Sequence, residues 1–307
     1  MNKYCLLTND VETTSIWFNS LRDETGYKVL REGMPPLLDI YDKYNIKTTF
    51  FFTGYIAKMF PDIVKMIIPY GHEVGSHSLL HKKEAGHDVS DLKTQIYYLS
   101  ESKKILEDIS GQEVISFRAP ALRVNQFTAK ALIQTGYKID SSIASQRFDM
   151  FMSFGSLKKL NWLTAPRLPY KTSIDSLFKK GNSPIVEVPL SATLFPYVGT
   201  TMRIFPIISN IQKRILSYES FLTGKPIVFD IHPNELIDES DLPRKIRNRS
   251  SNPFTYVLQD LVRSKLKVRN LGPIAGSLYE SQISYFKKKC FKFSTIQTYC
   301  KETGLLK

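Results

Sequence analysis

Short apolar runs alternate along the chain with longer segments in which apolar residues recur at helical spacing. Strand-like runs occur at positions 4–7, 47–52, 72–76, 114–117 and 137–140, and the run at 47–52 is rich in β-branched and aromatic residues. Segments 32–44, 61–70, 90–109 and 126–135 lie between them and have the 3.6-residue period of amphipathic helices. Strands that alternate with helices in this way predict βα units and a parallel sheet.

Two later runs, 185–188 and 227–231, are almost continuously apolar, as expected for parallel strands buried on both faces. Seven or eight such strands would close into a barrel more readily than they would lie flat. Segment 143–184 reads as long loops or a small hairpin insertion, 233–252 as a charged loop and 253–263 as a helix. We expect one catalytic domain over residues 1–307, with a core at about 4–235 and a basic, helical C-terminal extension at about 253–307.

Reactive side chains gather where these strands end. The residues in question are Asp10, Glu12, His77, His81, Arg118, Asp140 and His232. In a parallel α/β barrel the catalytic residues lie at the carboxyl ends of the strands. The pattern therefore predicts one polar site at the mouth of a barrel.

His77 and His81 are four residues apart, which on a helical turn would place both imidazoles on one face and within reach of one metal ion. Ser78 stands where a zincin motif would have glutamate. A carboxylate from another strand end would complete a site of two histidines and one carboxylate, with a position left open for water. In a strand, Asp10 and Glu12 face the same way, so both could reach this site.

Six ordered segments resemble the motifs of the polysaccharide deacetylase (NodB-homology) family. They are TNDVE (8–12), TTFFF (48–52), GHEVGSHSLLH (71–81), FRAP (117–120), DSS (140–142) and FDIHP (229–233). The resemblance covers residues 4–235 and implies a distorted (β/α)7 barrel. It also implies metal-dependent hydrolysis of an N-acyl group from an amino sugar.

Carried over by position, the resemblance implies that His77 and His81 ligate the metal and that Asp10 is the catalytic base. It makes His232 the acid that protonates the departing amine, and Arg118 the residue that orients Asp10. Asp140 joins the catalytic set, as a partner of Arg118 or His232, or else caps its strand.

The first motif departs from the two adjacent aspartates that many family members have, because Val11 occupies the second position. It resembles the Asp-x-Glu branch, which implies Glu12 as the third metal ligand. The reverse assignment, with Glu12 as base, stays open. The expected metal is Zn²⁺, with Co²⁺, Mn²⁺ or Ni²⁺ as alternatives.

The expected substrate is an amino sugar in a glycan, or a lipid- or nucleotide-linked precursor, that carries an acetyl or formyl group. A narrower alternative is a deformylase or deacetylase for a lipid-phosphate-linked sugar at the inner membrane face. Competing interpretations are hydrolysis of a small cyclic amide, which the histidine pair disfavours, and a catalytically inactive carbohydrate-binding barrel, which the filled motif positions disfavour.

The net charge of +13 comes from 42 basic and 29 acidic residues and is unevenly placed. Residues 1–150 hold 18 of each sign, so the whole surplus lies in the second half. It indicates either a solvated surface or attraction to an anion, such as a substrate phosphate or an anionic membrane near the 287–289 lysine run. No motif supports nucleic-acid binding. Three cysteines without a CxxC pair, and a polar segment directly after residue 7, lead us to expect a cytoplasmic protein, peripheral at most at the inner membrane.

Overall fold

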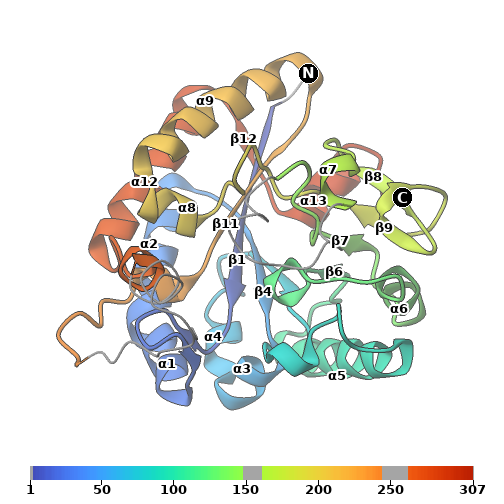
Figure 1. Ribbon diagram of the computed structural model, residues 1–307, viewed down its shortest axis with the longest axis horizontal. Coiled ribbons are helices and arrows are strands. Elements are labelled where there is room, and N and C mark those ends of the chain that lie inside the picture. The colour runs from blue at the N-terminus through green and yellow to red at the C-terminus, as the bar shows by residue number, and fades with distance from the viewer. Residues whose placement is uncertain (1–2, 148–160, 244–261, 307) are drawn as a thin grey trace.

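Seven parallel strands form a curled inner wall in the computed structural model, which describes residues 3–147, 161–243 and 262–306 (Figure 1). Their order is β11-β1-β4-β5-β6-β7-β10. They are β1 (Tyr4–Val11), β4 (Thr49–Phe52), β5 (Glu73–Ser76), β6 (Ser116–Phe117), β7 (Ile139–Asp140), β10 (Val186–Glu187) and β11 (Ile227–Ile231). The predicted distorted (β/α)7 barrel is confirmed.

The wall closes through a short irregular seam between the segment after β10 and strand β11. Ser191 N donates to the carbonyl of Val228 at 3.1 Å, and Ser191 Oγ accepts from Val228 N at 3.0 Å. Isolated bridges join Ala144 to Leu190 and Val198 to Asp230. Because few ladder bonds cross this seam, the barrel is distorted there.

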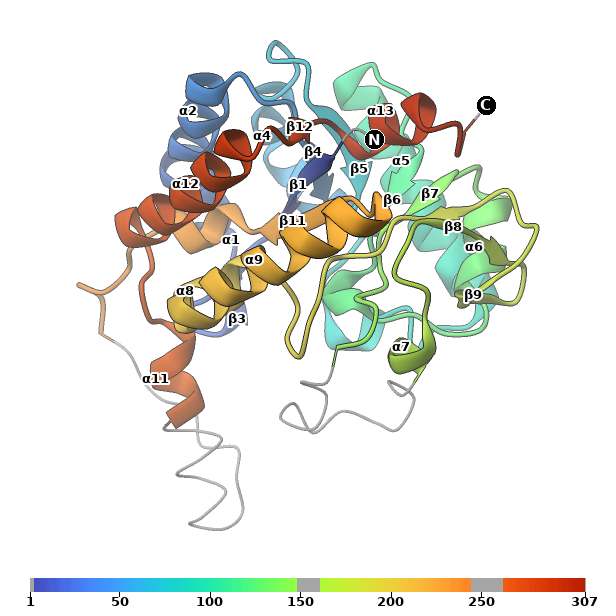
Figure 2. The same cartoon turned by 90° about the horizontal axis from the view of Figure 1, so that it is seen from above.

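Helices cover the outside of the wall, and the core has an outer and an inner part (Figures 1 and 2). Phe50 and Phe52 of β4 belong to the outer cluster, which packs against the helices, whereas Phe51 belongs to the inner cluster. Side chains alternate along a strand, so both faces of each strand are buried. This explains why the strands read as continuous apolar runs.

The long helix α5 (Leu92–Ser110) shows how local sequence sets an element. Asp91 caps its start by accepting a hydrogen bond from Thr94 N at 2.8 Å, and Gly111 ends it with a left-handed φ of 66°. The other helices that precede β10 are α1 (Asp23–Lys28), α2 (Met34–Tyr44), α3 (Gly54–Met59), α4 (Pro61–Lys65), α6 (Thr128–Gln134) and α7 (Asn161–Thr164). Shorter turns are η1 (Val29–Gly33), η2 (Lys83–Ala85) and η3 (Pro120–Leu122).

The expected insertion at 143–184 contains helix α7 and an antiparallel hairpin that extends the sheet from β10. The hairpin strands are β8 (Tyr170–Ser173) and β9 (Ser176–Lys180), and a second small hairpin joins β2 (Thr14–Ser15) to β3 (Ser20–Leu21). The expected charged loop begins with the turn η6 (Pro233–Leu236). The expected helix at 253–263 lies almost wholly outside the described residues.

Two helices between β10 and β11 were not predicted from the sequence, α8 (Gly199–Ile204) and α9 (Pro206–Thr223). The buried residues of α9 are Ser209, Gln212, Lys213, Leu216 and Ser220. Because most of these are polar or small, the usual apolar stripe that marks a core-facing helix is missing.

The C-terminal segment returns to the start of the chain. It comprises α11 (Arg263–Lys267), α12 (Pro273–Lys288), β12 (Lys292–Phe293) and α13 (Ile296–Glu302). Strand β12 pairs with Tyr4 and Cys5, at the end of β1 that β4 does not reach. Tyr299 and Cys300 of α13 join the inner cluster, so this segment closes the amino-terminal end of the barrel. No helix of the described residues is long and apolar enough to cross a membrane.

Candidate functional site

The carboxyl ends of β1 and β11 bring two carboxylates into the barrel mouth. Thr8 and Asp10 point inward from β1, and Asp230 points inward from β11, where Thr8 and Asp230 are register partners. Thr8 Oγ1 donates to Asp230 Oδ1 at 3.0 Å. Both aspartates are nearly inaccessible, with 5% and 3% exposure. The strand register therefore places two carboxyl groups side by side in the buried barrel mouth.

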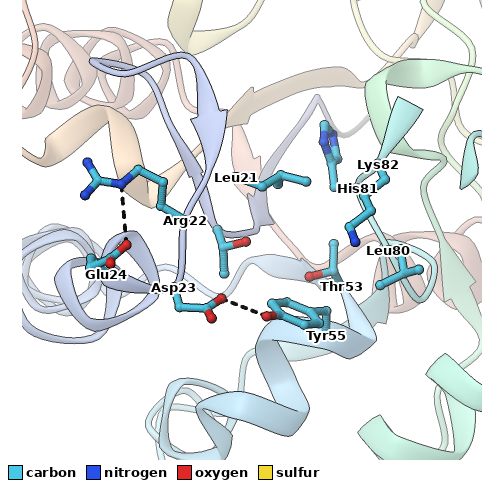
Figure 3. Close-up of a pocket in the computed structure, with 10 residues that line it drawn as sticks. Leu21, Arg22, Asp23, Glu24, Thr53, Tyr55, Leu80, His81 and Lys82 are labelled. Carbon is cyan, nitrogen blue, oxygen red and sulfur yellow. Dashed lines mark hydrogen bonds and ion pairs between the residues drawn. The ribbon is translucent and has the colours of Figure 1, made fainter. Parts of the chain in front are cut away.

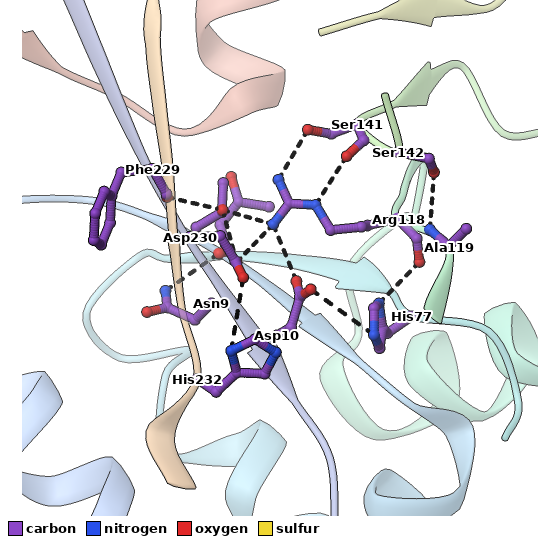
Figure 4. A network of polar contacts seen from close by, with 12 residues as sticks. Asn9, Asp10, His77, Arg118, Ala119, Ser141, Ser142, Phe229, Asp230 and His232 are labelled. Carbon is purple, nitrogen blue, oxygen red and sulfur yellow. Dashed lines mark hydrogen bonds and ion pairs between the residues drawn. The ribbon is translucent and has the colours of Figure 1, made fainter. Parts of the chain in front are cut away.

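Arg118 lies at the centre of this network and is fully buried (Figure 4). Its Nη1 donates to Asp10 Oδ1 at 3.0 Å and to Asp230 Oδ1 at 2.7 Å. Its other nitrogens bind Ser141, through Nε to the carbonyl and Nη2 to Oγ, both at 2.9 Å. One guanidinium thus compensates two carboxylates in a fixed orientation.

The two carboxylates respond differently to this shared cation. Burial opposes ionisation of Asp10, but the charge of Arg118 outweighs it, with help from His77 and His232, so the pKa of this carboxyl lies below its usual value. Burial and repulsion by Asp10 raise the pKa of Asp230 to about 8. Asp10 is the carboxylate that this site keeps ionised.

His77 and His81 lie in an irregular loop after β5, so the helical turn predicted for them is wrong. Ser78 has a left-handed φ of 63°, and its carbonyl accepts a hydrogen bond from Gly54 N at 2.8 Å. The loop still stacks the two imidazoles, with ring centroids 5.5 Å apart. The predicted juxtaposition is confirmed, although tertiary contacts produce it in place of helical periodicity.

Glu12 joins this histidine pair. Its Oε2 lies 2.9 Å from Nδ1 of His81 without the angular geometry of a hydrogen bond, so this buried oxygen has no donor in the described part of the chain. Candidate ligand atoms of Glu12, His77 and His81 all lie within 4.8 Å of one another. Burial opposes ionisation of Glu12, but His81 outweighs it and holds the pKa of this carboxyl at about 2.

His77 is prepared for ligation as well. Nδ1 of His77 lies 2.9 Å from the carbonyl of Arg118, which requires the proton on Nδ1 and leaves the lone pair on Nε2. Burial lowers the pKa of His77 to about 4, so its ring is neutral at physiological pH. A neutral imidazole and an orphaned buried carboxylate oxygen fit a divalent metal ion with borderline preferences.

His232 follows β11 and is backed by a buried ion pair. Its Nδ1 lies 3.2 Å from Glu235 Oε1 and 3.8 Å from Asp230 Oδ2. Glu235 in turn pairs with fully buried Arg203. Burial opposes protonation of the ring, but Glu235, followed by Asp230 and Asp10, outweighs it and raises the pKa of His232 to about 10.

The structure does not bring Asp140 into this network. Strand alternation directs Ser141, and not Asp140, toward Arg118. Asp140 instead accepts from Ser142 Oγ at 2.6 Å and interacts with its register partner Glu187, and both carboxyls are fully buried. Of the alternatives for Asp140, a direct ion pair with Arg118 is not observed among the described residues, and its place in the catalytic set stays a prediction.

The sequence predicts no role for Arg203 or Glu235, includes Ser141 only as part of a motif, and indicates His87 as a loop residue near His81. His87 is fully buried, with Nε2 2.9 Å from Ser78 Oγ and Nδ1 3.0 Å from Gln95 Oε1, so it braces the histidine loop. Glu235 had a local signal, because an acidic residue three positions after His232, with proline between them, forms a capping box. Arg203 lies in a helix that was not foreseen.

A hollow of about 410 Å³ opens beside His81 (Figure 3). Its lining residues are Thr13, Leu21, Arg22, Asp23, Glu24, Thr53, Tyr55, Leu80, His81 and Lys82. Two of these lining residues are joined directly, since Tyr55 donates to Asp23 Oδ1 at 2.7 Å, and the lining includes charges of both signs. Its size falls in the range of small-molecule sites.

The barrel mouth thus holds a carboxylate pair, two loop histidines and a third carboxylate, and the comparisons with known proteins agree with the motifs. The polysaccharide deacetylase family model matches residues 18–139. This stretch includes His77, His81 and Arg118 but not Asp10, Glu12 or His232. The chain is therefore similar to the polysaccharide deacetylase family over 122 of its 307 residues.

Individual relatives are more distant. The chain is 25% identical to a peptidoglycan deacetylase of Helicobacter pylori over 189 residues, 59% of this chain and 62% of the relative. It is 25% identical over 221 residues to a peptidoglycan deacetylase-like protein of Gibberella zeae, 67% of this chain and 62% of the relative. The chain thus spans less than two thirds of either relative.

A solved structure shares the fold. A Mycobacterium smegmatis protein assigned to the polysaccharide deacetylases superposes with a TM-score of 0.65 at 17% identity, covering 100% of this chain and 93% of the other.

Proposed function

We propose that this protein hydrolyses the N-acyl group of an amino sugar, with a divalent metal ion held by Glu12, His77 and His81. The observation that carries the proposal is the placement of a three-ligand cluster beside an ionised carboxylate and a protonated imidazole. Amide hydrolysis needs these three parts, because water is a weak nucleophile and an amine leaves only when protonated. Similarity to the polysaccharide deacetylase family supports the same reaction.

The metal site favours Zn²⁺, since two imidazoles and one carboxylate with an open position are typical of catalytic zinc. When bound, the metal would lower the pKa of a water molecule and polarise the carbonyl oxygen of the substrate. Glu12 suits the ligand role because its buried Oε2 has no hydrogen-bond donor among the described residues.

Asp10 suits the role of general base. Arg118 occupies its Oδ1, while Oδ2 lies 3.8 Å from His77 Nε2 at the edge of the ligand cluster. The ionised carboxylate can therefore accept a proton from water bound in that space. This assignment of Asp10 as base and Glu12 as ligand is the one we expected from the first motif.

His232 suits the role of general acid. Glu235 accepts the Nδ1 proton, which turns Nε2 with its own proton away from the ion pair. The imidazolium can give that proton to the amine nitrogen as the carbon–nitrogen bond breaks. Arg203 keeps Glu235 ionised, since a guanidinium beside a buried carboxylate favours its charged form.

The substrate class we propose is an N-acetylated or N-formylated amino sugar of a glycan or glycan precursor. The hollow beside His81 supports this class, because its lining offers hydrogen-bond donors and acceptors to sugar hydroxyl groups and includes charges of both signs. Related proteins are named peptidoglycan deacetylases, which supports acetyl over formyl.

The test is acyl release from a panel of free, nucleotide-linked, lipid-linked and polymeric amino sugars, with acetate and formate measured separately. We expect release with Zn²⁺ or Co²⁺ and none after chelation. His77→Ala should lose both metal and activity, whereas Asp62→Asn, an exposed carboxylate change, should alter neither. Metal-free protein that remains active, or a fully active His77→Ala variant, would overturn the proposal.

A further inference from the structure

Helix α9 exposes most of its apolar side chains and buries mainly polar or small ones, the reverse of an ordinary core-facing helix. Its exposed side chains include Ile207, Ile211, Ile215, Tyr218, Phe221 and Leu222, each more than half exposed. These residues recur at helical spacing and form one continuous stripe, which we call the α9 face. In Figure 2 the helix lies on the outside of the barrel, and no other helix or strand of the described residues covers it. A contiguous exposed apolar surface of this kind marks an interaction site.

The reversed orientation is held by specific bonds. Gln212, on the buried side, donates through Nε2 to Thr193 Oγ1 at 3.0 Å and to the Phe195 carbonyl at 2.8 Å. Near the other end, Glu219 binds Arg167 and Lys225. Turning the apolar side chains inward would break these contacts, so these bonds hold the α9 face toward the solvent.

Cations border the α9 face. A hollow of about 340 Å³ lies beside it and is lined by Lys3, Arg214, Ser217, Tyr218, Phe221, Tyr285 and Lys289. Three of these residues are basic and none is acidic. Tyr218 and Phe221 belong to both the hollow and the α9 face, so apolar and cationic surfaces are continuous. The acidic residue of the helix, Glu219, is engaged by Arg167 and Lys225.

We propose that the α9 face binds the surface of an anionic phospholipid membrane. The helix would lie in the interface, with its apolar side chains at the acyl boundary and the lipid phosphates near Lys3, Arg214 and Lys289. Interfacial helices combine an apolar face with flanking basic residues in this manner, and each basic residue near an anionic leaflet adds binding energy. The inference concerns a surface outside the proposed active site.

Charge favours this occupant over a second copy of the chain. Arg214 is exposed near the middle of the helix, so a two-fold contact centred there would bring two arginines together. The chain also carries a net charge of +13, which opposes self-association but attracts an anionic surface.

Vesicle sedimentation tests the proposal, with phosphatidylcholine vesicles that contain or lack phosphatidylglycerol. We expect binding only with phosphatidylglycerol, decreasing as salt rises. The triple variant Ile211→Ser, Tyr218→Ser, Phe221→Ser should lose binding. Arg214→Gln should weaken it roughly fivefold, the factor for one basic residue. A matched triple change of exposed residues elsewhere, Tyr27→Ser, Met59→Ser and Tyr97→Ser, should bind like the parent.

The variants alter exposed side chains, so thermal unfolding should confirm that they fold. Acyl release from a soluble substrate should be unchanged in the α9 triple variant, which separates failure of this inference from failure of the proposed function. Equal binding by parent and α9 triple variant would overturn the inference. The inference would also be overturned if the parent did not bind vesicles and instead formed a dimer in sedimentation equilibrium that the α9 triple variant did not form.

Discussion

Replacing Asp10 with asparagine separates the two roles available to the first-motif carboxylates. The side chain keeps its shape but loses the ability to accept a proton. If Asp10 is the base, kcat should fall by about 10²- to 10⁴-fold, the usual contribution of general base catalysis. Metal content should remain at the level of the parent, because Glu12, His77 and His81 are untouched.

The structure also predicts a modest effect on stability. Asp10→Asn weakens one charge-assisted hydrogen bond to Arg118, which is worth about 1.5–3 kcal/mol. Arg118 keeps its bond to Asp230, and the repulsion between the two carboxylates disappears. Because the loss and the relief oppose each other, we expect a net change within about 2 kcal/mol and a fully folded variant.

The assay combines single-turnover acyl release with metal analysis of the same preparations. Glu12→Gln serves as the paired variant and should lose metal affinity first, with activity partly restored by excess Zn²⁺. The reasoning is refuted if the outcomes are exchanged, with Asp10→Asn free of metal and Glu12→Gln fully loaded but inactive. That result would make Asp10 the ligand and Glu12 the base.

Three further changes test other parts of the structure. Burial raises the pKa of both Glu187 and Asp140, so the free energy of unfolding should fall as pH rises. Glu187→Gln should therefore raise Tm at pH 8, and thermal scans should show that this gain vanishes near pH 4. A Cβ at Gly199 would lie 2.6 Å from Glu235 Oε1, so Gly199→Ala should lower kcat more than it raises KM, and an unchanged kcat would contradict the support role of Glu235. Leu99→Ala, at a fully buried position of α5, should cost about 2–5 kcal/mol in urea unfolding, and a cost below 1 kcal/mol would contradict close packing there.

The barrel could be predicted because its strands are buried on both faces. A run such as 227–231, apolar except for one aspartate, is observed as a strand with the same bounds. Helix α5 could also be predicted from the sequence, because its apolar positions face the core and a glycine ends it. Helix α9 could not be predicted in this way, because most of its apolar side chains are exposed and the residues that it buries are mainly polar or small.

The site residues could be named from their order, but their contacts depend on register and tertiary structure. Asp140 and Ser141 are adjacent, and only the pairing of β6 with β7 decides which faces Arg118. The loop of His77 and His81 likewise depends on the backbone of Ser78, whose left-handed φ is stabilised by distant partners. Spacing alone could not supply either fact.

Strand β1 carries a consequence for how the chain folds. Its neighbours β11 and β12 lie more than 200 residues away in sequence, and Tyr4 OH donates to Glu302 across 298 positions. Forming these contacts requires closure of nearly the whole chain, which is entropically costly and slow. Strand β1 can therefore complete its pairing only after segments more than 200 residues later have been synthesised. Asp10 meets Asp230 only when β1 pairs with β11, so we expect the complete reactive centre to form late in folding.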